Sequence, residues 1–275
     1  MKKPSFSVLI SVYGKDEPEF LSEALESIFE KQTAKPDEII IVFDGPLSPE
    51  LHRVLDDFIK GKEDFVRFVP LENNVGLGEA LRIGTDFCSG DYIFRMDSDD
   101  ISVPERFEKQ MLYAAKHPET DVFGTDIAEF DSNISGEKRI RSCPENHSEI
   151  LKMSRFRCPM NHMSVCIKKS ALIKSGGYKP LFYLEDYYLW IRMLAAGCRF
   201  GNINETLVFA RTGNGFYSRR SSKKAFESRK FLLKFMVKKG MISPFEAAAS
   251  LVFAKIFISA PEKAKALFYK YFLRS

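Results

Sequence analysis

A short run of carboxylates carries the clearest chemistry in the sequence: Asp97, Asp99 and Asp100, with Ser98 after the first. The run follows the apolar segment 92–96, which we expect to be a buried strand. Carboxylates this close repel one another unless a cation or strong donors neutralise them. Mg2+ and Mn2+ take oxygen ligands and often bind through one or two carboxylates plus substrate phosphates. The run predicts a metal–phosphate site, with an ordinary turn or helix cap as an equal alternative.

Other residues could also do chemistry, each with a structural alternative. Glu185 and Asp186 open an amphipathic segment, where one carboxylate could serve as a general base or both could favour the helix dipole. Asn74 and Gly76 lie in a turn before a predicted helix, as in phosphate sites, but without the P-loop pattern. His162 stands alone, and a lone histidine is more often structural than a ligand.

Short apolar runs and helical patterns alternate along the first 130 residues. We expect strands at 6–13, 38–43, 65–71 and 92–96, and helices at 18–29, 49–58 and 76–88. Ser102 and Glu105 have the spacing of a capping box before a further helix. This alternation predicts a parallel, doubly wound sheet with ligands at the carboxyl ends of the strands. Beyond residue 120 we expect antiparallel strands at 122–130 and 137–141 and a helix at 185–196.

Composition narrows the class of protein. The 275 residues are 45% apolar and 28% charged, which excludes a disordered or fibrous chain. The five cysteines form no C-x-x-C pair, so we expect neither a disulfide framework nor a zinc cluster, and we expect a reducing compartment. The apolar run near the N-terminus is too short for a secretory signal, and no run reaches the length of a membrane span.

Charge is divided unequally along the chain. From Arg219 to the C-terminus, 14 Lys and Arg stand against 3 Glu, a net of +11, which leaves the preceding 218 residues with a net of −7. Basic and aromatic residues alternate in this tail, and we expect three amphipathic helices, separated at 240–244 and at Pro261. Such helices favour an anionic membrane interface. The alternatives are a helix packed on the preceding domain and a nucleic-acid surface.

Taken in order, these segments resemble the family-two glycosyltransferases with a GT-A fold, especially bacterial enzymes of O-antigen and exopolysaccharide assembly. The resemblance covers about residues 5–212. The matching residues are Val8–Tyr13, Ile41–Gly45, Asn74 with Gly76, Ala80 and Gly84, Gly90–Ile93, Asp97–Asp100, Asn161–His162, Gly176–Tyr178, and Glu185–Asp186 with Leu189 and Arg192.

The resemblance implies an α/β architecture: a Rossmann-like, mostly parallel central sheet flanked by helices, followed by a basic helical extension. Residues 1–218 would form the catalytic domain, with a nucleotide-sugar half at about 1–100 and an acceptor half at about 101–218. Residues 219–275 would form a membrane-associating tail.

The resemblance also implies roles for individual residues. Asp99, with Asp97, would bind Mn2+ or Mg2+, and Asp186 would be the general base with Glu185 beside it. The residues expected at the nucleotide-sugar are Ser11, Val12, Tyr13, Asp44, Asn74, Gly76, Asp97, Ser98, Arg219 and Arg220. The residues expected at the acceptor are His162, Tyr183 and Trp190.

The activity implied is inverting transfer of one hexose or N-acetylhexosamine from a UDP-sugar, with UDP-galactose or UDP-glucose as the favoured donors. The acceptor would be an undecaprenyl-diphosphate-linked sugar at the inner, cytoplasmic face of the cell membrane, with no nucleic acid involved. Met193 follows Arg192 where processive synthases carry R-W, which favours transfer of a single sugar. A nucleotidyltransferase and a non-catalytic sugar-nucleotide-binding module are the alternatives.

Overall fold

The computed structural model describes residues 4–131, 134–212 and 223–259. In chain order its elements are β1 (Phe6–Tyr13), α1 (Pro18–Ile28), β2 (Glu38–Asp44), α2 (Pro49–Ile59), β3 (Val66–Pro70), α3 (Leu77–Phe87), β4 (Tyr92–Met96), β5 (Ile101–Ser102), α4 (Arg106–Lys116), β6 (Val122–Phe130), β7 (Arg139–Arg141), α5 (His147–Met153), η1 (His162–Ser164), β8 (Cys166–Lys168), α6 (Lys169–Lys174), α7 (Glu185–Ala195), β9 (Phe200–Arg211), α9 (Lys223–Lys238) and α10 (Pro244–Ser259).

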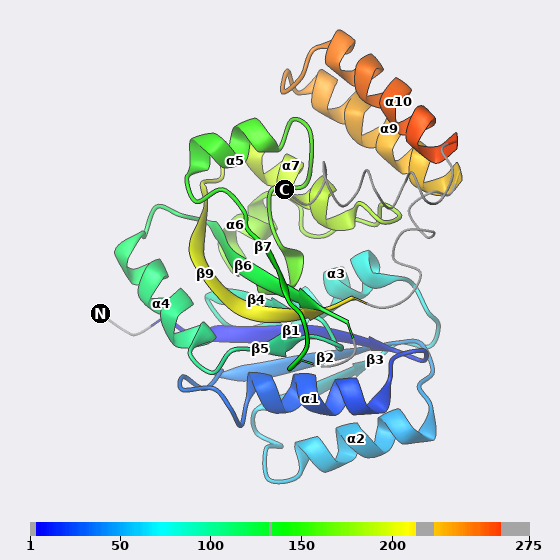
Figure 1. Ribbon diagram of the computed structural model, residues 1–275. Helices are drawn as coiled ribbons and strands as arrows, with labels where there is room; N and C mark the ends of the chain where they lie inside the picture. The colour runs from blue at the N-terminus through cyan, green and yellow to red at the C-terminus, as the bar shows by residue number, and fades with distance from the viewer. Residues whose placement is uncertain (1–3, 132–133, 213–222, 260–275) are drawn as a thin grey trace.

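A single mixed sheet runs through the molecule in the order β3-β2-β1-β4-β8-β6-β9-β5, and β7 pairs with β6 (Figure 1). The strands β3, β2, β1 and β4 are parallel, as the alternation of strand and helix predicts. The strand β8 is antiparallel to both β4 and β6, and it joins the parallel half to the second half of the sheet. The predicted antiparallel pairing of 122–130 with the segment before residue 142 is confirmed.

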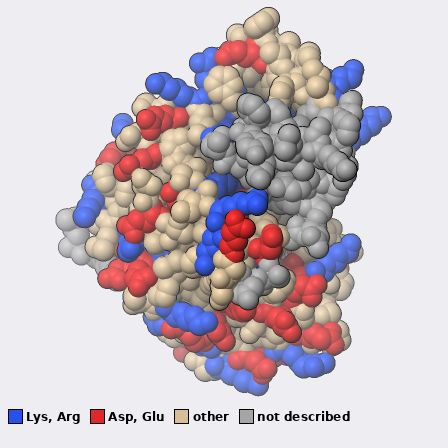
Figure 2. Space-filling model, viewed as in Figure 1, with Lys and Arg blue, Asp and Glu red and all other residues tan. Residues whose placement is uncertain are grey.

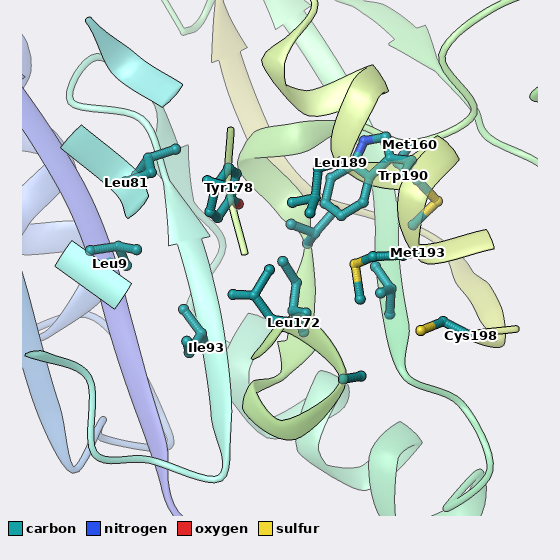
Figure 3. Packing of buried hydrophobic residues seen from close by; sticks show 14 of the residues in the cluster. Leu9, Leu81, Ile93, Met160, Leu172, Tyr178, Leu189, Trp190, Met193 and Cys198 are labelled. Atoms are coloured by element: carbon teal, nitrogen blue, oxygen red, sulfur yellow. The ribbon is translucent and has the colours of Figure 1, made fainter. Parts of the chain in front are cut away.

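Helices cover both faces of this sheet. Buried side chains of α1, α2 and α4 pack on one face with Val8, Ile10 and Val12 of β1. Helices α3, α6 and α7 cover the other face, where Leu9 lies (Figure 3). Buried on both sides, β1 and β2 read as continuous apolar runs. Gly84 lets α3 approach closely, because a Cβ there would lie 2.5–2.6 Å from side-chain carbons of Leu9 and Val42.

The helix caps confirm one prediction and correct another. Ser48 caps α2, and its Oγ accepts a hydrogen bond from the Leu51 amide. The prediction of a capping box formed by Ser102 and Glu105 is wrong. Ser102 belongs to β5, and α4 begins after Glu105 without a side-chain cap. Pairing of β5 with β9 holds Ser102 in extended backbone. The spacing of neighbouring residues cannot predict such a long-range contact.

The described part of the tail is a hairpin of two helices, α9 and α10, that lies beside α7 (Figure 1). Leu232, Leu233 and Met236 of α9 form one apolar cluster with Tyr187 and Tyr188 of α7 and with a few neighbours. This face of α9 is therefore packed on the preceding domain, which was one of the alternatives predicted for the tail. The third predicted helix, beyond Pro261, lies outside the described residues. No helix within the described ranges is long and apolar enough to cross a bilayer.

Candidate active site

The ends of β1, β2 and β4 bring three predicted segments together, because the carboxyl ends of parallel strands meet at one edge of a sheet. Tyr13 ends β1, Asp44 ends β2, and Asp97 follows β4. The Tyr13 ring is 38% exposed, and the Ser11 side chain is partly buried. The Val12 side chain is fully buried in the core, so only its backbone can reach a nucleotide.

Asp97, Asp99 and Asp100 form a compact oxygen-donor group, since each offers a carboxylate oxygen within 4.8 Å of the other two. Burial and the negative charges of Asp97 and Asp16 raise the pKa of Asp99 to about 7. The pKa of Asp100 is raised well above its ordinary value, first by burial and then by its two acidic neighbours. Mutual repulsion of this size is what a bound divalent cation relieves.

Buried Arg95 in β4 is the counter-charge beneath this group. Its side chain is 2% exposed and forms an ion pair with Asp97. Burial by itself lowers the pKa of Arg95, but the Asp97 carboxylate outweighs it and raises the pKa. An arginine inside an otherwise apolar strand is the sign by which sequence reasoning could have found this residue, and it was missed.

Arg211, at the end of β9, holds the other side of the acidic loop. Its amide donates to Asp100 Oδ1 at 2.8 Å, and its Nε donates to the Asp99 carbonyl at 3.1 Å. The guanidinium also contacts Glu23 at 2.6 Å and lies over the Phe20 ring. The second oxygen of Asp100 is buried without a hydrogen-bond partner in the described structure, which leaves a lone pair for a cation.

Asp16, in the loop after β1, joins the nucleotide side of the site to the acidic run. Its Oδ2 accepts hydrogen bonds from the Ser98 hydroxyl at 2.7 Å and from the Tyr13 amide at 3.1 Å. Burial raises its pKa to about 6, with smaller contributions from Asp97 and Asp44. Ser98, predicted at the nucleotide, thus orients the loop through Asp16. Sequence analysis missed Asp16, which has no distinguishing pattern.

Asp44 has partners within the chain. Its Oδ1 accepts from the Val75 amide at 2.6 Å, and its Oδ2 accepts from the Gly76 amide at 3.0 Å and the Asn74 side chain at 3.1 Å. The residue is 4% exposed. These bonds tie the loop before α3 to the end of β2. Asp44 thus shapes the pocket together with Asn74 and Gly76, and its expected contact with uracil stays a prediction.

Glu185 and Asp186 begin α7 as predicted and lie beside the start of α3, where a Cβ on Gly78 would be 3.1 Å from the Glu185 Cβ. Burial and then the charge of Asp186 raise the pKa of Glu185 to about 7, and Arg95 and Asp97 also act on it. Asp186 accepts from the Tyr187 amide at 2.6 Å and contacts the Cys158 thiol at 3.5 Å. A carboxylate has about four acceptor positions, so Asp186 can still accept a proton.

Two residues predicted at the acceptor are placed elsewhere. Trp190 is fully buried among Leu189, Met193 and their neighbours in the core, so a direct acceptor contact is wrong (Figure 3). His162 is 8% exposed and hydrogen-bonds the Tyr178 hydroxyl at 3.0 Å. Burial, with a smaller effect of Arg95, holds the pKa of His162 well below its ordinary value. Arg219 and Arg220 lie outside the described residues.

Comparison with known proteins decides the family. The model of the family described as Glycosyl transferase family 2 matches residues 7–182. The chain belongs to glycosyl transferase family 2. An uncharacterized glycosyltransferase of Haemophilus influenzae is 46% identical over 84% of this chain and 85% of its own. Amylovoran biosynthesis glycosyltransferase AmsE of Erwinia amylovora is 40% identical over 78% and 79%. An Escherichia coli UDP-Gal:alpha-D-GlcNAc-diphosphoundecaprenol beta-1,3-galactosyltransferase is 41% identical over 79% and 78%.

Solved structures confirm the GT-A fold of this glycosyltransferase. Staphylococcus aureus TarS 1–349, in complex with UDP-GlcNAc, superposes with a TM-score of 0.69 at 15% identity over 95% of this chain and 77% of that one. The mannosyltransferase PcManGT from Pyrobaculum calidifontis, in complex with GDP-Man and Mn2+, gives 0.64 at 14% identity over 98% and 79%. The nucleotidyltransferase and binding-module alternatives are set aside, because the relatives are glycosyltransferases.

A divalent cation suits the residues of this family-two enzyme. All three donors are carboxylate oxygens, one of them buried without a partner, and Mg2+ or Mn2+ prefers such ligands. Asp97, Asp99 and Asp100 would hold the cation, which would offset the negative charge of a leaving diphosphate.

Proposed function

We propose that this enzyme transfers one hexose or N-acetylhexosamine from a UDP-sugar, with inversion, to a sugar on a polyprenyl diphosphate in surface-polysaccharide assembly. The observation that carries the proposal is the oxygen-donor group at the end of β4, together with the carboxylate pair at the start of α7. The two are close enough for the charges of Arg95 and Asp97 to act on the pKa of Glu185. UDP-galactose is the favoured donor, supported by the Escherichia coli relative's name, and UDP-glucose is the second candidate.

In the proposed reaction, Asp186 removes the proton from the acceptor hydroxyl while that oxygen attacks the anomeric carbon and the bond to UDP breaks. A general base must face the cleft and remain ionised at working pH. Burial raises the pKa of Glu185 to about 7, so Glu185 is protonated over part of the working pH range. Asp186 keeps free acceptor positions beside its bonds to the Tyr187 amide and the Cys158 thiol, which supports Asp186 as the base.

A membrane position is part of the proposal. Phe245, Val252 and Ile256 on the hairpin are 82%, 60% and 64% exposed, and lysines lie along α9. In Figure 2 the hairpin at the top of the view is mostly uncharged, with basic side chains at its edges and a small acidic patch on the same face. Apolar and basic side chains together favour an anionic lipid surface. This surface would hold the enzyme at the inner face of the cytoplasmic membrane, where the lipid-linked acceptor would lie.

The first experiment measures UDP release with Mn2+ across a panel of UDP-sugars, with and without a synthetic GlcNAc-diphosphate-lipid. Release that depends on the acceptor and on one donor supports the proposal. Asp186→Asn should lower kcat by about 10²–10⁴-fold, whereas Asp57→Asn, an exposed carboxylate on α2, should not change it. Tight UDP binding with no transfer to any acceptor would argue against the proposed reaction.

Membrane binding is tested separately with vesicles of anionic and neutral lipid. Val252→Glu and Ile256→Glu should each weaken sedimentation with anionic vesicles, because a carboxylate on this face opposes both the apolar and the charge contact. Leu112→Glu is the matched control, since Leu112 is 55% exposed on α4 rather than on the hairpin. Equal vesicle binding by all three variants and the wild type would contradict this position.

A further inference from the structure

Tyr183 has an unusual backbone conformation directly before the carboxylate pair of α7. Its φ is +60°, and no other non-glycine residue of the described ranges has a positive φ. The Leu184 amide donates to the Leu181 carbonyl at 2.8 Å, so Phe182 and Tyr183 are the central residues of a β-turn. A positive φ at the second central position is normally left to glycine or asparagine. The chain therefore keeps a large aromatic side chain where the backbone disfavours one.

Packing on both sides of the turn holds this conformation. Leu181 and Leu184 pack against the cluster shared by α7 and α9. The Phe182 ring lies 4.1 Å from the Tyr183 ring, centroid to centroid, and Lys224 of α9 lies 4.3 Å from the Phe182 centroid. The aliphatic side chains of Leu181 and Leu184 thus pack both ends of the turn against the protein. The Lys224 ammonium of the hairpin adds a cation–π contact to the Phe182 ring.

The Tyr183 ring is nonetheless 37% exposed, two residues before Glu185 and three before Asp186. Backbone strain persists where surrounding structure over-determines it, and it concentrates at functional sites. An exposed aromatic residue this close along the chain to the proposed base is a candidate to contact the substrate whose hydroxyl that base would deprotonate. The apolar face of a pyranose ring suits an aromatic ring of this kind.

We propose that the Tyr183 ring is a stacking platform for the acceptor sugar, held in place by the strained turn and by Phe182 and Lys224. This inference rests on the proposed glycosyl transfer. Asp186 would take the proton of the acceptor hydroxyl, while Tyr183 would fix the sugar ring that carries the hydroxyl. Removing the platform therefore weakens acceptor binding and leaves donor binding intact.

The test compares Tyr183→Phe, Tyr183→Gly and Tyr183→Ala in the full-length enzyme, with the GlcNAc-diphosphate-lipid as acceptor. We expect Tyr183→Phe to stay near the wild-type KM for the acceptor, because it keeps the ring. We expect Tyr183→Gly and Tyr183→Ala to raise that KM about 3–10-fold, the range of an aromatic contact. The KM for the UDP-sugar should not change in any of the three. A rise in donor KM equal to the rise in acceptor KM would overturn the assignment.

Thermal unfolding separates a platform from a merely structural turn. Glycine relieves the positive φ, so Tyr183→Gly should melt above Tyr183→Ala although both lose the ring. A glycine variant that melts higher and binds acceptor as well as the wild type would overturn the platform. Calorimetric titration of the GlcNAc-diphosphate-lipid into UDP-loaded enzyme measures the same binding without turnover. Acceptor binding that Tyr183→Gly weakens, with no transfer by the wild type, would refute the proposed reaction and keep the platform.

Discussion

Replacing Asp99 by asparagine should stabilise the protein without metal at pH 8. The substitution keeps the size of the side chain and removes one charge from a group whose oxygens lie within 4.8 Å of one another. Coulomb's law gives about 1 kcal/mol per pair at this separation in a water-like medium, and about 3 kcal/mol at an effective dielectric constant of about 20. Partial solvent exposure of Asp99 favours the lower figure. About 1 kcal/mol corresponds to a rise in Tm of about 2–4 °C for a chain of this size.

The pH dependence of this effect has a definite sign. The pKa of Asp99 is about 7 in the folded chain, against about 4 in an unfolded one. Between these values the folded chain keeps a proton that the unfolded chain has lost, so the stability of the metal-free wild type falls as pH rises from about 4 through about 7. At pH 5.5, about midway through this range, the gain from Asp99→Asn should be about half of its value at pH 8, and below about pH 4 it should vanish.

Differential scanning fluorimetry of both proteins at pH 5.5 and 8, with EDTA or with Mn2+, measures this directly. With Mn2+ the order should reverse, because the wild type gains about 2.7 kcal/mol when the cation is at 100 times its Kd, and the variant loses a ligand. Asp57→Asn, outside the site, should respond to neither pH nor Mn2+ in this way. The reasoning would be refuted if Asp99→Asn lowered the Tm of the metal-free protein at pH 8.

Three further predictions follow from the geometry. Glu185→Gln should remove an inflection near pH 7 from the pH profile of kcat/KM and keep more activity than Asp186→Asn, because Glu185 titrates near pH 7; an unchanged profile would contradict it. Asp44→Ala should raise the KM for the UDP-sugar and lower stability by about 2 kcal/mol, since it leaves two loop amides unpaired; kinetics and urea unfolding measure both. Gly84→Ala should destabilise by about 1–3 kcal/mol through overpacking against β1 and β2, with metal affinity unchanged, as urea unfolding and Mn2+ titration will show.

Local patterns predicted the first half of the fold well. The strands and helices up to β4 alternate in hydrophobic period, and each parallel strand carries its own apolar run. The carboxyl ends of such strands meet, so the convergence of Tyr13, Asp44 and Asp97 followed from the same reasoning. The acidic run and the start of α7 were recognisable as well, because carboxylates stood out beside apolar segments.

Long-range contacts explain what local patterns missed. The antiparallel insertion of β8 between β4 and β6 depends on pairing across more than 70 residues with β4 and across more than 40 residues with β6. The resemblance implied Trp190 at the acceptor, but its side chain is fully buried in the core. Asp44 was expected at the nucleotide, and its hydrogen bonds to amides 31 and 32 residues further along the chain were not predicted. Pattern alone did not show which partner a carboxylate would have.

The packing of α9 on α7 also decides where this protein can be divided. A chain shortened after residue 218 keeps the whole segment that matches the family, but it uncovers Tyr187, Tyr188 and Ile191 in the first two turns of α7. An uncovered apolar patch of this kind favours aggregation. The first turn of α7 would also lose the neighbour that fixes its angle. We therefore expect the smallest piece that folds as a unit to include the hairpin and to be larger than the segment that the family model matches.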